Sequence, residues 1–598
     1  MDKNSLVLEA QGLKKIFRAG DRTIEALKGV DVQVRSGMVT GLIGPDAAGK
    51  STFMRLAAGL MKPSDGSVYV LGLDAAAESQ QIHEKIAYMP QRFGLYEDLT
   101  VQENLDLYAD LQLFPRTKRK ERYKRLMEMT GLAPFMDRLA GRLSGGMKQK
   151  LGLACCLIRP PEFLILDEPT VGVDPVSRRE LWEIVYSQVD QLGMSVLVST
   201  AYLDEAERCS RVVLLHDGRI IGSGKPGDFS AKMAGRVFLL NPARKEKRIL
   251  QLRLSQKPQV VDALIQGDRI RLVMSEQLEP DQVGSSLSLP DQIEITPVEP
   301  RFEDAFIYLL RQKGDTATEV REAENQGEDI GLGIHKPVQG SRTDVVIDVQ
   351  RLTKRFGEFY AVREITFQVR RGEIFGLLGA NGAGKSTTFR MLCGLLPPTS
   401  GKLLVAGCDM LTAGPAAKKM IGYMAQKFSL YEDLTSRENL EFFSHAYGLS
   451  GRVRQEKIAW AMDAFGLEKV AGVRSRNLPL GFKQRLSLAA ALMHEPDVLF
   501  LDEPTSGVDP VTRREFWRHI NVLAEAKVTI MVTTHFLEEA EYCDRLVIMA
   551  DGTILDQGTP DEVRRRCSTE ENPSPTMEDA FIFLIQREAQ KRSLVTVE

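Results

Sequence analysis

The chain has 598 residues, 43% of them hydrophobic and 27% charged, which suits a globular protein of about three to five domains. Its net charge is −3, so no global basic field favours a nucleic-acid partner. The first residues, MDKNSLVLEAQGLKK, lack the apolar core of a secretion signal, and no run reaches the roughly 18 apolar residues of a membrane-spanning helix. If the protein acts at a membrane, we therefore expect another chain to span it.

The seven cysteines are scattered apart from the neighbours Cys155 and Cys156. They form neither a disulfide framework nor a Cys-x-x-Cys metal pattern. We interpret them as thiols buried as small hydrophobic side chains in a reducing cytoplasm.

Residues 6–230 have the pattern of an α/β domain. Short apolar runs alternate with helical stretches: VTGLIG at 39–44, FLILD at 163–167 and SVLVST at 195–200. Runs that are apolar without alternation are typical of parallel strands buried on both faces. The sequence therefore predicts a doubly covered sheet.

A glycine-rich loop follows the first of these runs. It reads Gly44-x-x-x-x-Gly49-Lys50-Ser51, with Thr52 next, and fits the P-loop pattern of nucleotide-binding proteins. Glycines let the backbone turn tightly, so that successive N–H groups face phosphate oxygens, and the following helix adds its positive end. In this interpretation Lys50 reaches the β- and γ-phosphates of a nucleotide, and the Ser51 hydroxyl binds Mg²⁺. The alternative is a chance glycine-rich turn, but this loop also follows a strand and begins a helix.

Two acidic residues, Asp167 and Glu168, follow four apolar residues of the second run. A carboxylate at the end of a buried strand is costly unless it meets a charge, and Mg²⁺ supplies one. We predict that Asp167 binds the metal and that Glu168 acts as the general base that polarises an attacking water. The alternative is an ordinary acidic pair facing solvent.

The middle of the chain has a different character. Residues 231–313 contain the strand-like GRVFLL and DRIRLVM and a helical QVVDALIQ, which predicts a small α+β appendage. Residues 314–343 are polar and read as a flexible linker. Similar amphipathic helices are expected at RFEDAFIYLL (301–310) and TMEDAFIFLI (576–585), the latter within a helical tail over 568–598.

The α/β unit is then repeated at 344–567. Lys50 and Lys385, Gln91 and Gln426, and Asp167 and Asp502 are each 335 positions apart. A constant offset over so long a stretch indicates two copies of one domain. The second copy therefore predicts its own ATP and Mg²⁺ residues: Gly379, Gly384, Lys385, Ser386, Thr387, Asp502 and the base Glu503.

The order of P-loop, glutamine loop, LSGGMKQ, LILDEP and GVDP resembles that of the ATP-binding cassette ATPases, over about three-quarters of the chain. The resemblance implies that two cassettes pair head to tail within the chain and enclose ATP between one P-loop and the opposite signature. It implies that Gln91 and Gln426 contact Mg²⁺ and the attacking water. It also implies that Asp174 and Asp509 cross the seam between the cassettes. Phe17 and Phe356 lie where an aromatic ring would stack on adenine, although each also fits a core phenylalanine at a strand end.

The signature differs between the two copies. Residues 143–151 read LSGGMKQKL and offer the Ser144 hydroxyl and the close approach of Gly145 and Gly146 to the γ-phosphate. Residues 478–486 read LPLGFKQRL. Pro479 is tolerated in a first helical turn but has neither a hydroxyl nor an N–H, and Leu480 places a branched side chain at the contact.

Two further differences affect the first P-loop. His535 matches the family's switch histidine, which contacts the γ-phosphate, whereas the first copy has Ala201. The first P-loop also has Ala47 where the second has Gly382, at a cost of about 1 kcal/mol if the position requires positive φ. Head-to-tail pairing would place these defects with LPLG in one site and leave the second P-loop with LSGG. We expect one hydrolysing and one mainly nucleotide-holding site; tolerated drift in two active sites is the alternative.

The LYEDLT and EDAF segments resemble those of bacterial export ATPases with separate permeases. The resemblance implies two membrane permease subunits, each with a short helix in a groove lined by residues 92–105 or 427–440, at the cytoplasmic side of the membrane. One alternative is a ribosome-associated tandem cassette, which the interdomain strands and the negative net charge disfavour. The other is a sugar importer's ATPase. The sequence shows no substrate pocket.

Overall fold

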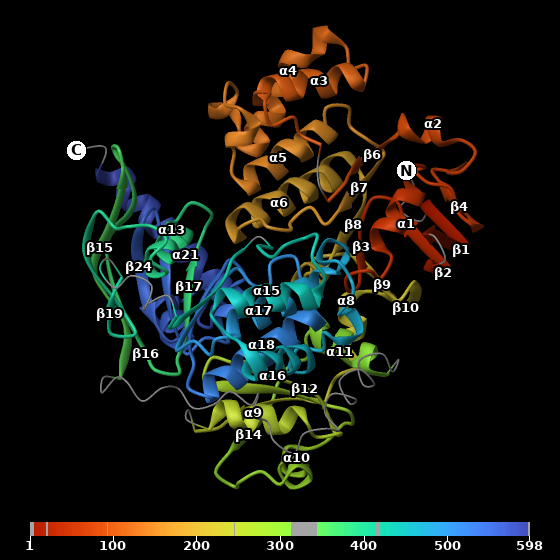
Figure 1. Ribbon diagram of the computed structural model, residues 1–598. Helices are drawn as coiled ribbons and strands as arrows, with labels where there is room; N and C mark the ends of the chain where they lie inside the picture. Colours follow the sequence, from red (N-terminus) through yellow and green to blue (C-terminus); the bar gives the residue numbers. More distant parts are fainter. Residues whose placement is uncertain are drawn as a thin grey trace. The chain divides into compact units, whose positions relative to one another are not determined.

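A computed structural model describes residues 5–19, 22–91, 94–243, 246–312, 344–410, 412, 419–426 and 428–595 (Figure 1). It divides into two compact units. One comprises Met1–Ala234, Pro300–Gln312 and Asp509–Val511, and the other comprises Gly235–Glu299, Lys313–Val508 and Thr512–Glu598. The expected linker at 314–343 lies outside the described residues. Among the described residues, no helix combines the length and the hydropathy needed to cross a membrane.

The first unit contains two sheets. The central sheet has the order β10-β9-β3-β8-β7-β6, in which β10 is antiparallel to its neighbour and the other pairs are parallel. The other sheet is antiparallel, with the order β2-β1-β4-β5. The strands are β1 (Leu6–Ala19), β2 (Arg22–Arg35), β3 (Val39–Ile43), β4 (Asp65–Val70), β5 (Leu73–Asp74), β6 (Ile86–Met89), β7 (Phe163–Asp167), β8 (Ser195–Thr200), β9 (Arg211–His216) and β10 (Arg219–Gly224).

The apolar runs predicted from the sequence form the centre of this sheet. Every residue of β3, β7 and β8 is buried, because helices and the antiparallel sheet cover both faces. The helices are α1 (Lys50–Ala57), α2 (Ser79–His83), α3 (Val101–Leu111), α4 (Arg116–Thr130), α5 (Gly145–Cys156), α6 (Pro175–Leu192), α7 (Leu203–Glu207), α8 (Pro226–Ala231) and α11 (Phe302–Gln312).

Helix α11 packs against α7 and α8 of this unit. The ring of Phe302 meets Phe229 edge-on at 5.8 Å and stacks on Phe306 at 6.4 Å. The N–H of Phe302 donates to the carboxylate of Glu207 at 2.9 Å. The end of the stretch expected to form the appendage therefore belongs with the first cassette.

The second unit repeats the architecture of the first. Its central sheet has the order β20-β21-β22-β17-β23-β24, and its antiparallel sheet the order β16-β15-β18-β19. The strands are β15 (Val345–Phe356), β16 (Phe359–Arg370), β17 (Ile374–Gly379), β18 (Ser400–Val405), β19 (Cys408–Asp409), β20 (Ile421–Met424), β21 (Val498–Asp502), β22 (Thr529–Thr534), β23 (Arg545–Ala550) and β24 (Thr553–Gly558). The described helices are α13 (Lys385–Leu392), α15 (Ser436–Ala446), α16 (Gly451–Ala464), α17 (Leu480–Leu492), α18 (Pro510–Glu525), α19 (Leu537–Ala540), α20 (Pro560–Arg566) and α21 (Met577–Val595).

The two faces of this central sheet have separate cores. Phe500 and Met531 pack with α13 and the antiparallel sheet. Leu499, Leu501 and Val532, which point the other way, pack with α17 and α18. The prediction of two α/β domains in tandem is confirmed.

Residues 235–299, here called the accessory domain, form a third sheet in the second unit. Its elements are β11 (Val237–Asn241), α9 (Lys247–Ser255), β12 (Val260–Gln266), β13 (Arg269–Met274), α10 (Pro280–Leu287) and β14 (Glu294–Pro297). The antiparallel strand order is β12-β13-β11-β14, which gives the predicted α+β character. The expected helix at QVVDALIQ is wrong: it is strand β12, because alternate residues are buried and the segment forms a hairpin with β13.

Candidate nucleotide-binding sites

Each P-loop joins a central strand to a helix and leaves no room for a side chain at its first and last glycines. Gly49 and Gly384 precede α1 and α13 with φ of 106° and 99°. A Cβ on Gly44 would lie 2.1 Å from the carbonyl oxygen of Leu215, and one on Gly379 would lie 2.6 Å from that of Met549. The backbone approach that phosphate binding requires is therefore present in both copies.

The P-loop lysines fold back over their own loops. Lys50 Nζ donates to the carbonyl oxygens of Gly44 at 2.8 Å and Pro45 at 3.0 Å. Lys385 Nζ makes the same contacts, with Gly379 at 2.6 Å and with the next residue at 3.1 Å. Both lysines are buried, so each places a positive charge where phosphate oxygens would enter.

The hydroxyl residues follow these lysines on the first turn of each helix. Ser51 and Thr52 lie on α1, Ser386 and Thr387 lie on α13, and all four are half-buried. Ser51 Oγ donates to Asp167 Oδ1 at 3.1 Å. A hydroxyl and a carboxylate therefore converge beside the first P-loop.

The predicted metal carboxylates are buried and oriented by hydroxyls. Ser199 Oγ donates to Asp167 at 2.7 Å, and Thr533 Oγ1 donates to Asp502 at 2.6 Å. Burial and the neighbouring Glu503 carboxylate raise the pKa of Asp502. Oxygen donors on a buried acid suit Mg²⁺, whose charge would offset the cost of burying the ionised form.

The predicted general bases sit in a strained backbone. Glu168 and Glu503 have φ of 50° and 47°, and each N–H donates to a β-strand hydroxyl at 2.9 Å. The Gln91 amide donates to Glu168, and Gln426 Nε2 donates to Glu503 Oε2 at 2.7 Å. These carboxylates are buried, so the alternative of a solvent-facing acidic pair does not hold.

The switch position distinguishes the two copies. His535 Nδ1 lies 3.1 Å from Glu503 Oε2. Burial raises the pKa of Glu503, but the hydrogen bond from His535 and the Lys385 ammonium outweigh it, so its pKa lies below its usual value. Ala201 cannot make this contact, and Glu168 lies 3.3 Å from Lys50 instead. The second cassette has a histidine on its base, and the first does not.

The two signature helices start with the same backbone but different chemistry. Ser144 caps α5 with φ −66° and ψ 163°, and its Oγ accepts the N–H of Met147 at 3.3 Å. Pro479 caps α17 with φ −55° and ψ 153° and has no side-chain cap. Leu480 replaces the exposed Gly145 and is half-buried.

The glycine that both signatures keep has a structural reason. A Cβ on Gly146 would lie 2.4 Å from Ser177 Oγ, and one on Gly481 would lie 2.7 Å from Thr512 Cγ2. The tight contact with the following long helix therefore explains why LPLG retains its last residue.

The conformation at the substituted P-loop position is left-handed in both copies. Ala47 has φ 61° and Gly382 has φ 87°. Alanine in this region costs about 1–2 kcal/mol, so the predicted penalty applies to the first P-loop.

The remaining predicted residues lie at element ends. Asp174 is the N-cap of α6 and accepts the N–H of Ser177 at 3.1 Å, and Asp509 precedes α18 and accepts the N–H of Val511 at 3.0 Å. Phe17 is 37% exposed and Phe356 is 50% exposed. Neither ring is buried, so the core alternative is not what the structure shows.

Sequence reasoning missed two buried residues, Asn104 and Asn439. The Asn104 amide accepts the N–H of Tyr96 and donates to the carbonyls of Tyr96, Leu99 and Thr100 at 2.9–3.3 Å. Asn439 makes the same set in the second copy. They order the LYEDLT loop, and the repetition of ENL in both copies was the available signal.

Comparisons with known proteins agree with this geometry. The family model described as ABC transporter matches residues 27–171 and 362–506. The chain is 51% identical, over 97% of its length and 98% of the relative, to the probable multidrug ABC transporter ATP-binding protein YbhF of Escherichia coli (strain K12). The chain belongs to the ABC transporter family.

Other matches cover one cassette of this ABC protein. The Nod factor export ATP-binding protein I of Rhizobium sp. (strain N33) is 42% identical over 36% of this chain and 71% of its own. A solved ATP binding subunit of an ABC transporter is 28% identical, with a TM-score of 0.37 over 40% of this chain and 99% of its own. The family match and the identity to YbhF over nearly the whole chain show an ABC-type ATPase, the ATP-binding subunit of a transporter, as predicted.

Proposed function

We propose that the protein powers export through separate permease subunits, with one complete and one degenerate ATP site. Support for export comes from the relatives, since YbhF is named for multidrug transport and the other match for Nod factor export. The His535–Glu503 contact is the observation that carries the asymmetry, because the first cassette has Ala201 in its place. The second P-loop with the LSGG signature would form the complete site.

In the complete site, the second cassette's own residues prepare hydrolysis. Lys385 and the loop N–H groups would bind the phosphates, and Asp502 and Ser386 would hold Mg²⁺, which when bound offsets phosphate charge. Glu503 accepts the proton of the attacking water, while Gln426 and His535 fix the carboxylate. A carboxylate held ionised suits a base, which must be unprotonated to act.

The first P-loop would hold nucleotide with little hydrolysis. Its base Glu168 has Lys50 and Gln91 but no histidine, and the facing signature would be LPLG. Loss of one positioned donor costs about 2.7–4 kcal/mol of transition-state stabilisation. With both the histidine and the signature donors missing from one site, ATP would still bind there but would be hydrolysed very slowly. Asp174 and Asp509 would cross the seam, and Phe17 and Phe356 would stack on adenine.

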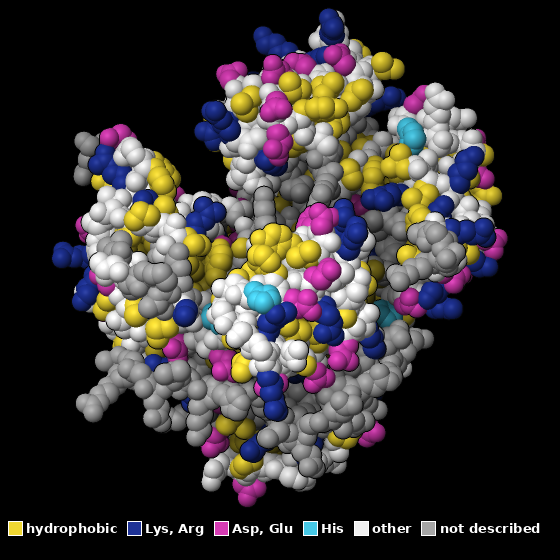
Figure 2. All heavy atoms as spheres, viewed as in Figure 1, with side chains coloured by type: hydrophobic (Ala, Val, Ile, Leu, Met, Phe, Trp, Pro, Cys, Tyr) yellow, Lys and Arg dark blue, Asp and Glu magenta, His cyan; other side chains and the backbone are white. Residues whose placement is uncertain are grey.

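The loops after the glutamines are the proposed permease contacts, at the cytoplasmic side of the membrane. Residues 92–93 and 427 lie outside the described residues. Asn104 and Asn439 hold the LYEDLT part of each proposed contact segment by hydrogen bonds to its backbone. Tyr431 is 49% exposed and Phe442 is 43% exposed, with ring centroids 4.5 Å apart. Hydrophobic side chains gather on the surface over α15 (Figure 2). Exposed aromatic side chains of this kind suit an inserted helix, and two such grooves suit two permeases.

The test of the asymmetry is turnover of two matched variants in the full chain. We expect Glu503→Gln to abolish ATP hydrolysis and Glu168→Gln to keep most of it. If Glu168→Gln abolishes hydrolysis and Glu503→Gln spares it, the assignment is reversed. Equal partial losses would show two working sites instead.

Permease binding has its own test. The double variant Tyr431→Ala/Phe442→Ala changes the contact of the second cassette only, so the amount of candidate permease that co-purifies should fall, with ATP binding unchanged. An unchanged amount would exclude this contact, and ribosomal RNA in the eluate without membrane association would contradict the exporter assignment.

A further inference from the structure

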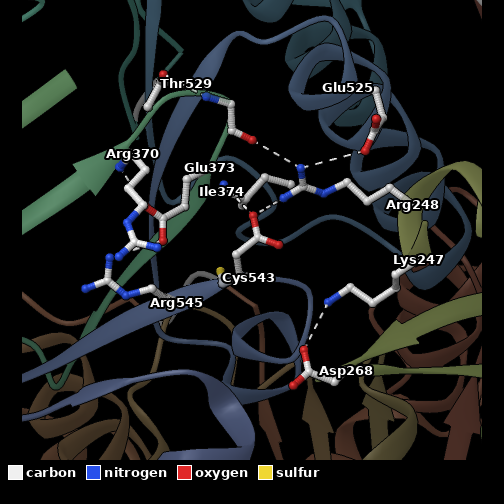
Figure 3. A network of polar contacts seen from close by, with 12 residues as sticks. Lys247, Arg248, Asp268, Arg370, Glu373, Ile374, Glu525, Thr529, Cys543 and Arg545 are labelled. Atoms are coloured by element: carbon white, nitrogen blue, oxygen red, sulfur yellow. Dashed lines mark hydrogen bonds and ion pairs between the residues drawn. The ribbon is translucent and has the colours of Figure 1, made fainter. Parts of the chain in front are cut away.

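The accessory domain contacts the second cassette through largely buried charges. Arg248 on α9 donates to the carbonyl oxygen of Gly372 at 3.1 Å, forms an ion pair with Asp544, and lies 4.0 Å from Glu525 (Figure 3). Asp544 also accepts the N–H of Ile374 at 2.9 Å, where β17 begins. Arg248 of the accessory domain thus contacts the second cassette just before β17, just before β23 and at the end of α18.

A hairpin tip makes the second contact. The N–H of Gly267 donates to the carbonyl of Glu541 at 3.0 Å, and the N–H of Asp268 donates to Asp561 at 3.0 Å. Gly267 has φ 57°, and a Cβ there would lie 2.5 Å from Asp561. Lys247 Nζ holds the tip from within the accessory domain, 2.6 Å from the Gly267 carbonyl oxygen. Because Glu541 is the C-cap of α19, the tip pairs a carbonyl at the end of the helix that follows His535.

A third contact reaches α18. Arg514 Nε donates to Asp262 of β12 at 2.7 Å, and both side chains are largely buried. The preceding Arg513 donates to the carbonyl of Val508 at 3.3 Å and lies 3.8 Å from Glu539 of α19. Arg513 therefore links α18 to α19, and the neighbouring Arg514 links α18 to Asp262 of the accessory domain.

Two of the acidic residues that receive the accessory domain, Asp544 and Asp561, are found in the second cassette but not in the first. Where the second cassette has Asp544 and Asp561, the first has Ser210 and Gly227 at the aligned positions. Neither replacement can accept a hydrogen bond as a carboxylate. The cassette fold, which both copies share, therefore does not require these two carboxylates.

We propose that the accessory domain positions the catalytic face of the second cassette. It holds α18, which follows the Asp509 loop, and α19, which begins two residues after His535, so that the histidine stays on Glu503 through turnover. Asp262, Arg248 and the hairpin tip act as positioning residues, since none of them touches the nucleotide-binding residues. This inference rests on the proposed function, which assigns hydrolysis to the second P-loop.

The test compares matched arginines in the full-length chain. Arg514→Ala removes the contact with Asp262, whereas Arg179→Ala changes the equivalent arginine of the first cassette, which lies 3.4 Å from Glu183 on an exposed helix face. We expect Arg514→Ala to lower kcat for ATP about tenfold with KM within twofold, because positioning acts on turnover and not on binding. Arg179→Ala should change kcat by less than twofold.

Further variants separate positioning from misfolding. Arg514→Lys keeps the charge and should recover at least a third of the original kcat, and Asp262→Ala/Arg514→Ala should be no slower than Arg514→Ala. Gly267→Ala should also lower kcat with unchanged KM, while Gly227→Ala, where a Cβ meets nothing within 4 Å, should not.

Three results would overturn the inference: kcat within twofold for Arg514→Ala and Gly267→Ala, a loss that appears in KM instead, or an equal loss in Arg179→Ala. If Glu503→Gln abolishes hydrolysis but these variants do not slow it, the positioning role alone fails. If Glu503→Gln leaves hydrolysis intact, the proposed function fails.

Discussion

Replacing Ser144 with proline transfers the second signature's defect to the first signature. The change fits the backbone, because Ser144 has φ −66° and the preceding Leu143 has φ −81° and ψ 152°, both compatible with proline. Pro479 already occupies the same position of α17 with φ −55°. The fold of α5 should therefore survive.

Ser144→Pro is expected to lower the stability of α5 slightly and the rate of ATP hydrolysis strongly. The hydroxyl that accepts the N–H of Met147 at 3.3 Å is lost, which costs about 1 kcal/mol of helix capping. The variant also removes the hydroxyl and the N–H from a helix end proposed to face the γ-phosphate. By analogy with a lost oxyanion donor, about 2.7–4 kcal/mol, kcat should fall about 10²–10³-fold.

Steady-state ATP hydrolysis by the full chain measures this effect, with circular dichroism as the check on folding. The reciprocal variant Pro479→Ser is the control: it adds a cap to α17 but should raise kcat less than twofold, because Ala201 remains. Turnover of Ser144→Pro within threefold of the unmodified chain would refute the reasoning. A tenfold rise for Pro479→Ser would show that the degenerate signature limits hydrolysis.

His535→Ala should lower kcat about 10²–10³-fold because it removes the contact with the base; activity within threefold in the same assay would contradict this. Gly379→Ala should abolish binding of fluorescent ATP at its loop, because its Cβ would meet a carbonyl oxygen at 2.6 Å, whereas Gly382→Ala should weaken binding only about five- to thirtyfold. Equal effects would be inconsistent with the loop geometry. Phe302→Ala should cost about 3–5 kcal/mol in urea unfolding of the first unit, since its ring is fully buried; a loss below about 1 kcal/mol would count against the α11 packing.

Most of the site could be predicted because its residues follow strand ends at short, fixed spacings. Lys50 follows β3 and Asp167 ends β7. These two parallel strands have only β8 between them, so both residues lie at the same edge of the sheet. Asn104 was missed because the repeated ENL does not by itself indicate that the asparagine is buried and orders a loop. The segment 259–266 was predicted as a helix, although partnership with β13 makes it a strand.

The sequence by itself determined the two cassettes, their motifs and the donors that each has lost, because these depend on residue type and spacing within one short segment. Tertiary structure decided which cassette each part of the stretch 231–313 joins. Arg248 meets Asp544 across 296 positions, and Asp268 meets Asp561 across 293. Contacts between residues so far apart arise only when two folded surfaces match in shape and charge, and no local pattern records that match.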